Sequence, residues 1–214
     1  LQNICNYYIS SCFFNETTSS KKDGLDWFKN DKRQKNLTKL RKKFITAGVD
    51  EVGRGCLAGP VVSAAVILKE GINLKLLKDS KKVSFKKRQE ISDHIKLHSI
   101  YAIGLASVVE ILNLNILQAS LLSMKRAVEK LPVKPDLTLI DGNFAPSGLK
   151  NCKTIINGDQ KVKVISAASI IAKVYRDKLM IKLAQEFSDY AWESNFGYGT
   201  KAHLEGLKKF GITS

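Results

Sequence analysis

Residues 45–62, ITAGVDEVGRGCLAGPVV, start like a strand of a protein interior and then change character. After five mostly small or apolar residues come two adjacent acids, Asp50 and Glu51, and shortly afterwards Arg54 between two glycines. Like charges held together beside an apolar interior cost free energy unless a cation or a proton offsets them. The stretch therefore predicts a core strand whose end carries a site for something positively charged.

The composition indicates a globular chain of ordinary size and strongly basic character. It has 214 residues, with 35 Lys and Arg against 20 Asp and Glu, and a formal net charge of +15. A charge of this sign and size favours a polyanionic partner such as a nucleic acid or an acidic membrane surface. A membrane-spanning helix needs roughly 20 apolar residues in a row. No run in the sequence approaches that length.

The cysteines indicate a reducing compartment. Cys5, Cys12, Cys56 and Cys152 are scattered, without a C-x-x-C pair or a matching histidine spacing. Neither a zinc site nor a disulfide framework is indicated. The N-terminal stretch has apolar patches but no basic region ahead of them, so a signal peptide is not expected. We therefore expect an intracellular, cytoplasmic protein.

The first 43 residues differ from the rest of the chain. Residues 1–43 lack a clean hydrophobic period and end in the basic stretch DKRQKNLTKLRKK. We favour a solvated, partly disordered extension; the alternative is a basic arm that adds non-specific phosphate contacts. Residues 44–214 are expected to form one catalytic domain that includes the C-terminal helices.

The hydrophobic pattern of the second region predicts an α/β domain. Amphipathic helices are expected at residues 109–130 and 166–187, and a short basic helix from about Lys201. Strands are expected in four stretches of apolar or small residues: FITAGVD (44–50), VVSAAVIL (61–68), YAIGLASV (101–108) and DLTLID (136–141). Strands and helices in this order indicate a mixed sheet flanked by helices.

Two of the expected strands end in a carboxylate. Asp50 ends the first and Asp141 the fourth, so the two side chains converge if these strands are neighbours in the sheet. Glu51 points to the opposite face of a regular strand and joins them only if the strand ends or bends, as Gly53 permits. A divalent hard cation with oxygen ligands relieves the repulsion between such acids.

Five blocks of residues 44–211 carry information together: GVDEVGRG…AGPVV, DSKKVSFKKR, LIDGN, GD…SAASIIAKVYRD and GYGTKAHLEGL. In this order they resemble one enzyme family, bacterial-like type 2 ribonuclease H (ribonuclease HII). The resemblance implies a ribonuclease H-like fold, a mixed sheet flanked by helices. It also implies a site of four carboxylates that binds two Mg²⁺ or Mn²⁺ ions.

Carried over by motif, the first three metal ligands are Asp50, Glu51 and Asp141. The fourth requires a choice between Asp159, which precedes the SAASI helix, and Asp177, which lies well along it. The family pattern favours Asp159. We interpret Asp177 as a residue of the helix surface or of a structural ion pair.

The resemblance also assigns residues that bind the substrate. The loop of Gly53, Arg54 and Gly55 resembles the element that recognises a ribonucleotide joined to a deoxyribonucleotide, and Arg54 argues against type 3 enzymes, which carry GTG. Tyr198 matches the tyrosine that stacks on the deoxyribose; the alternative is a half-buried core tyrosine. Cys56 departs from the proline of many members, which removes no ligand.

Further basic residues are candidates for contacts with the nucleic-acid backbone. Ser80, Lys81 and Lys82 of DSKK resemble the family's substrate-backbone contacts. Lys173 and Arg176 of the IIAKVYRD helix are less certain candidates, because spacing alone does not orient them.

The implied activity is metal-dependent hydrolysis of the RNA strand of RNA:DNA hybrids. It includes cleavage on the 5′ side of single ribonucleotides in duplex DNA, as in ribonucleotide excision repair and primer removal, giving 3′-OH and 5′-phosphate ends. We expect a monomer. The alternative is a basic nucleic-acid-binding module that has lost its site, and four retained acids argue against it. A metal site at His94 and His98 is disfavoured because no glutamate accompanies them.

Overall fold

The computed structural model describes residues 44–70, 72 and 83–213 of the chain. The predictions for residues 1–43, and for Ser80, Lys81 and Lys82, lie outside the described residues.

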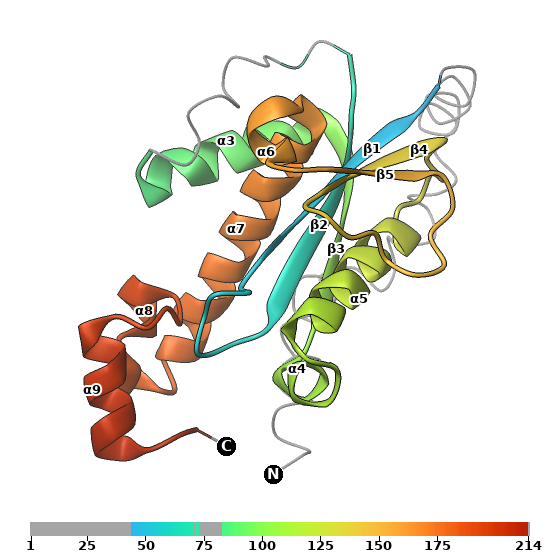
Figure 1. The fold of residues 1–214 in the computed structure, drawn as a ribbon. Helices are drawn as coiled ribbons and strands as arrows, with labels where there is room; N and C mark the ends of the chain where they lie inside the picture. The colour runs from blue at the N-terminus through green and yellow to red at the C-terminus, as the bar shows by residue number, and fades with distance from the viewer. Residues whose placement is uncertain (1–43, 71, 73–82, 214) are drawn as a thin grey trace, which may run out of the picture.

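A single mixed sheet forms the centre of the described structure (Figure 1). Its strand order is β3-β2-β1-β4-β5. Strand β2 runs antiparallel to both of its neighbours, β1 and β3, whereas β4 runs parallel to β1 and β5 parallel to β4. The strands are β1 (Thr46–Val52), β2 (Val61–Leu68), β3 (Ser99–Ala106), β4 (Leu137–Asp141) and β5 (Cys152–Ile155). The predicted α/β class with a mixed sheet is confirmed.

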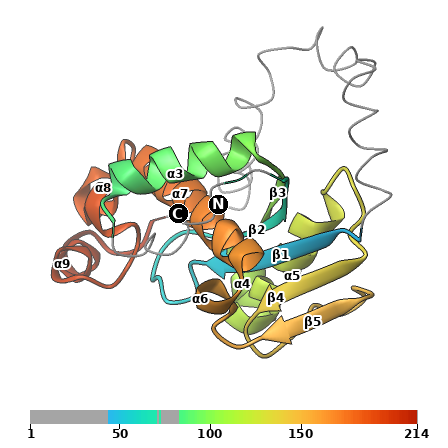
Figure 2. The same cartoon turned by 90° about the horizontal axis from the view of Figure 1, so that it is seen from above.

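Helices cover both faces of this sheet, as the two views in Figures 1 and 2 agree. On one face α5 (Ile116–Glu129) packs through Met124 and Ala127 against Ala65 of β2. On the other face α7 (Lys163–Ala184), together with α3 (Phe85–Leu97), packs against β2 residues of the opposite parity, such as Ala64. Because alternate side chains of β2 meet two different cores, the strand is apolar throughout rather than alternating.

The prediction of a single helix at residues 109–130 is wrong in one respect, because this region forms two helices. The first is α4 (Val108–Leu114) and the second is α5, and Asn115 separates them with a φ of 69°. The Asn115 side chain accepts hydrogen bonds from the backbone N–H groups of Leu117 and Gln118, so it caps the start of α5. Asparagine tolerates this left-handed conformation and is a strong N-cap, which explains why the chain turns there.

Other boundaries also differ from the prediction. Strand β5 was not among the four predicted strands; it is only four residues long and carries little pattern. Helix α7 begins at Lys163, three residues before the predicted start, and ends at Ala184. A separate short helix, α6 (Gly158–Lys161), precedes it.

The C-terminal part packs on the far end of α7. It comprises a 3₁₀ turn, η3 (Ser188–Tyr190), then α8 (Trp192–Asn195) and α9 (Lys201–Phe210). Tyr190 and Trp192 join Met180 of α7 in a small apolar cluster. None of the helices in the described part of the chain is long and apolar enough to cross a membrane.

Candidate active site

Two acids meet where the parallel strands β1 and β4 lie side by side. The register pairs Val49 with Ile140, so the next residues, Asp50 and Asp141, are neighbours across the two strands. Val49 and Ile140 both belong to the core under α5. Since successive side chains of a strand alternate between faces, both acids point to the α7 side. The expected convergence of Asp50 and Asp141 is confirmed.

Glu51 belongs to the same strand but is held differently. β1 continues to Val52, so of the two conditions predicted for Glu51, a strand end or a bend, the strand end is not met at Glu51 itself. The backbone N–H of Glu51 donates to Oδ1 of Asp50 at 2.7 Å. Its carboxylate Oε1 lies 3.3 Å from Nη1 of Arg54. Glu51 nevertheless lines the same pocket as Asp50.

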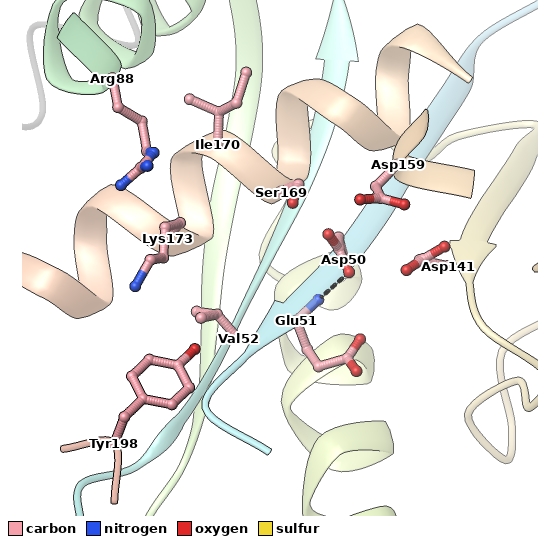
Figure 3. Close-up of a pocket in the computed structure, with 10 residues that line it drawn as sticks. All are labelled: Asp50, Glu51, Val52, Arg88, Asp141, Asp159, Ser169, Ile170, Lys173 and Tyr198. Atoms are coloured by element: carbon pink, nitrogen blue, oxygen red, sulfur yellow. Dashed lines mark hydrogen bonds between the residues drawn. The ribbon is translucent and has the colours of Figure 1, made fainter. Parts of the chain in front are cut away.

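The short helix α6 brings in the fourth acid. The backbone N–H of Gly158 donates to Oδ1 of Asp141, which ties the start of α6 to the end of β4. Asp159, the next residue, lines the pocket beside Asp50 and Asp141 (Figure 3). Asn157 at the start of this turn has a left-handed φ of 54°, which lets the chain reverse from β5 into α6.

The four acids open into one pocket of about 340 Å³. In the close-up of Figure 3, the acids gather on one side, and Arg88, Lys173 and Tyr198 lie on the other. The complete lining is Asp50, Glu51, Val52, Arg88, Asp141, Asp159, Ser169, Ile170, Lys173 and Tyr198. An acidic end and a basic end therefore share one cavity.

The electrostatics of the acidic end favour a cation. Burial raises the pKa of Asp50 well above its ordinary value, and the charges of Glu51 and Asp141 raise it further, while a hydrogen bond from Ser169 lowers it. Burial likewise raises the pKa of Glu51, partly offset by Arg54. Acids that resist ionisation in this way are stabilised when a positive ion is bound beside them.

The donor set suits a divalent hard cation. The four side chains offer only carboxylate oxygens, the ligands that Mg²⁺ and Mn²⁺ prefer. In the described part of the chain, no three acidic, histidine or cysteine side chains are already grouped around one ion position. Ion binding would therefore draw the carboxylates closer together.

The other candidate for the fourth acid has a different environment. The Asp177 side chain is completely buried, and its Oδ1 lies 2.7 Å from Nζ of Lys173. Its Oδ2 lies 3.8 Å from Nη1 of Arg88. Burial raises the pKa of Asp177, and Lys173 and Arg88 offset only part of this effect, so the pKa stays above its ordinary value. Asp177 is thus enclosed by cations, in an ion pair that is buried rather than on the helix surface.

The two basic residues proposed for α7 are placed very differently. Lys173 lines the pocket, with Nζ 4.9 Å from the ring centre of Phe196 and 5.3 Å from that of Tyr198. Arg176 is fully buried and bonds to backbone carbonyls, so the idea that it faces the nucleic acid is wrong. Residues 173 and 176 are three apart on a helix, yet only the first reaches the cavity.

Tyr198 lies at the rim of the pocket and is 38% exposed. An isolated antiparallel bridge pairs it with Cys56, at the end of the loop that contains Gly53, Arg54 and Gly55. The side chain of Arg54 is 49% exposed. The loop and the tyrosine that were singled out from the sequence are therefore next to each other.

Some pocket residues were not identified from the sequence. Ser169 hydrogen-bonds to Asp50 and lies one helical turn before Lys173, a spacing that could have placed both on one face of α7. Arg88 is the last residue of the block DSKKVSFKKR but was not singled out as a candidate. The rings of His94 and His98, by contrast, contact each other at a tilt of 33° with centres 4.3 Å apart, and neither residue lines the pocket.

The site has acids on two neighbouring parallel strands, a further acid before a long helix, and basic residues on the other side of the pocket. Together with the sheet topology, these features define a nuclease of ribonuclease H-like architecture. The family model of ribonuclease HII matches residues 47–214. The ribonuclease HII of Pelagibacter ubique is 61% identical over 171 residues, covering 79% of this chain and 91% of that protein. The chain belongs to the ribonuclease HII family.

Solved structures agree with this assignment. The ribonuclease H2 of Pyrococcus horikoshii superimposes with a TM-score of 0.66 at 28% identity, covering 79% of this chain and 90% of that one. A Bst RNase HIII in complex with Mn²⁺ gives a TM-score of 0.61 at 18% identity, covering 78% and 63%, a likeness of fold. The chain is an endonuclease that cleaves RNA in RNA:DNA hybrids.

Proposed function

We propose that this chain cuts the RNA strand of hybrids and the 5′ side of single ribonucleotides in duplex DNA, leaving 3′-OH and 5′-phosphate ends. One observation carries the proposal: four carboxylates share a pocket with Tyr198, and Tyr198 forms a β-bridge with Cys56, the residue directly after the loop of Gly53, Arg54 and Gly55. The acids proposed to carry out the cleavage therefore lie next to the residues proposed to recognise the sugar. One chain supplies all four acids, so a monomer suffices.

Asp50, Glu51, Asp141 and Asp159 would hold two divalent ions, Mg²⁺ or Mn²⁺. When bound, such ions supply Lewis acidity that makes water a better nucleophile and offset the charge that develops on the phosphate. The residues of the chain orient these acids: Ser169 hydrogen-bonds to Asp50, and the Gly158 N–H fixes Asp141. Asp177 is not a ligand in this proposal, because Lys173 and Arg88 already compensate its charge.

The loop of Gly53, Arg54 and Gly55 would read the ribose. Its glycines let backbone groups approach the sugar, whose 2′-OH both donates and accepts hydrogen bonds and so distinguishes RNA from DNA. Tyr198, exposed at the pocket rim, would stack on the deoxyribose that follows. The half-exposed guanidinium of Arg54 stays near Glu51 and so joins this loop to the acids.

Basic residues would hold the phosphates. Lys173 and Arg88 occupy the non-acidic side of the pocket. Ser80, Lys81 and Lys82 remain proposed backbone contacts on the strength of the DSKK motif. Such contacts contribute affinity without reading sequence, in keeping with the net charge of +15.

The decisive experiment uses a DNA duplex with one embedded ribonucleotide and a matched duplex in which that sugar is 2′-deoxy. With Mg²⁺ or Mn²⁺ we expect a single cut on the 5′ side of the ribonucleotide and almost none in the all-deoxy duplex, since the site then loses a group that its polar atoms pair with. Both duplexes should bind with similar affinity. Equal cleavage of the two would replace this proposal with a general metal-dependent nuclease.

A further inference from the structure

A buried guanidinium lies beneath the rim of the active site. Arg176 of α7 is completely buried. Its Nε donates to the carbonyl of Pro60 at 2.9 Å, and its Nη1 and Nη2 donate to those of Phe196 and Ala58 at 2.7 Å each. All three acceptors are main-chain carbonyls. A buried charge needs such pairing, so removal of Arg176 would leave several carbonyls unsatisfied.

These acceptors belong to two segments that are far apart in the sequence. Ala58 and Pro60 end the loop of residues 53–60, and Phe196 belongs to the turn of residues 195–199. The segments also touch directly, because the N–H of Leu57 donates to the carbonyl of Gly197 at 2.8 Å. Arg176 therefore lies where the two segments join, and its planar fork of donors bonds to both.

The backbone closes tightly around the guanidinium. Gly53 has a φ of +112°, and a Cβ there would lie 2.7 Å from Nε of Arg176 and 2.8 Å from the carbonyl oxygen of Pro60. Gly197 has a φ of +84°, and a Cβ there would lie 2.5 Å from the carbonyl oxygen of Ala58. Residues with side chains would push the two segments away from Arg176 and from each other.

Building on the function proposed above, we propose that Arg176 is a positioning residue that fixes the ribose-reading loop of residues 53–55 relative to Tyr198. It touches no substrate and acts through the carbonyls that it holds. The loop and the tyrosine would contact successive sugars on the two sides of a ribose–deoxyribose junction. Their separation must therefore stay constant for the scissile phosphate to reach the acids, and a misplacement of about 1 Å costs roughly 100-fold in rate.

The test compares Arg176→Met, which removes the donors at similar length, with Arg176→Lys, which keeps the charge and part of the bonding. Arg126→Met is the matched control. Arg126 donates to the carbonyl of Leu105 at 2.8 Å and pairs with Glu110, but it lies on α5, at the opposite face of the sheet. It shares the chemistry of Arg176 without contacting the recognition loop.

The first readout is amide hydrogen exchange, which needs no activity. In Arg176→Met the amide of Leu57 should exchange at least about tenfold faster than in the wild type, because its bond to Gly197 opens more often, while amides of β1 stay protected. Arg176→Lys should be intermediate. In Arg126→Met the Leu57 amide should exchange as in the wild type.

The second readout is single-turnover cleavage of the single-ribonucleotide duplex at saturating enzyme, with its Kd measured separately. Arg176→Met should lower the rate about 10- to 100-fold, with Kd within about threefold because phosphate contacts supply the affinity. Arg176→Lys should recover part of the rate, and Arg126→Met should cleave normally.

Unchanged exchange at Leu57 in Arg176→Met would overturn the proposal, and so would faster exchange with an unaltered cleavage rate. Loss of protection in β1 would reveal that Arg176→Met does not fold. In that case Arg176→Lys decides the question by the exchange of the Leu57 amide and by the cleavage rate. If the wild type cuts ribose and all-deoxy duplexes alike, the proposed function fails. The exchange data would still decide whether Arg176 joins the two segments.

Discussion

Two groups of charged residues lie beside α7. In one group acids face other acids, and in the other an acid faces cations. At the start of the helix, Asp50 and Asp141 share a pocket with other acids, and the neighbouring acids add to the effect of burial on the pKa of Asp50. Further along, Asp177 is fully buried between Lys173 and Arg88, which counteract the effect of burial on its pKa. Like charges that reinforce one another favour a bound cation, as proposed for the acidic pocket, whereas a buried acid with its charge partly offset by two cations fits a structural ion pair.

The largest effect on activity is expected from a change at Asp141. We expect Asp141→Asn to lower Mg²⁺-supported cleavage by at least about 100-fold, because a neutral amide is a poor ligand of nearly the same shape. Stability should be unchanged or slightly higher, since one repelling charge is removed. Cleavage assays and urea unfolding in chelator measure the two effects. Substantial residual cleavage would remove Asp141 from the metal site.

The two candidates for the fourth acid should separate activity from stability. Asp159→Asn should lower cleavage by about 100-fold and leave the folded state intact. Asp177→Asn should cost much less activity but destabilise the fold by about 2 kcal/mol. This is less than the loss expected when a fully buried ion pair is broken, because Lys173 keeps some exposure to water. Parallel activity and unfolding measurements test this, and the opposite ordering would assign the metal site to Asp177.

The acidic group should also control how stability depends on pH without metal. The pKa of Asp50 is raised in the folded state, so the unfolded chain ionises first as the pH rises above the ordinary value of 3.8. Unfolding is therefore increasingly favoured up to the raised pKa. Asp50→Asn lacks this penalty, so in chelator it should be more stable than the wild type at neutral pH, with a gap that shrinks on acidification. A constant gap in urea unfolding would contradict the raised pKa.

The smallest effect should come from a third set of charges, the basic stretch of residues 31–43. Deletion of residues 1–40 should leave the cut position unchanged and weaken binding mainly at low salt, because phosphate contacts there carry no readout. Binding isotherms at several salt concentrations and mapping of the products check this. A shifted cut would show that the extension takes part in recognition.

The comparison also explains what the sequence could predict. Asp50 and Asp141 were paired correctly because each follows an apolar run, and strand pairing alone then brings them together. The same pattern could not orient Lys173 and Arg176, which share one helix although Lys173 is 25% exposed and lines the pocket while Arg176 is fully buried. Their difference depends on which backbone carbonyls come to lie beside α7, and those belong to segments distant in sequence.

The sequence pattern did not predict the break between α4 and α5, because a short polar residue interrupts the helical periodicity there. Apolar residues recur across the region of α4 and α5, yet Asn115 divides it by capping the second helix with its own side chain. Strand β5 has four residues, too few to carry a period. Glu51 was expected to join the other acids only where its strand ends or bends, and it lines the pocket although β1 continues to Val52.

The parallel pairing of β1 with β4 has a consequence for the order of folding. The contact between Ile45 and Asp136 at the start of this pair spans 91 residues, and β2, β3 and the helices between them must be accommodated before it closes. Pairing over such a distance is slow, because much chain entropy is lost before contacts compensate for it. We therefore expect the acids of β1 and β4 to come together late in folding, after the local helices and the β2–β3 hairpin have formed.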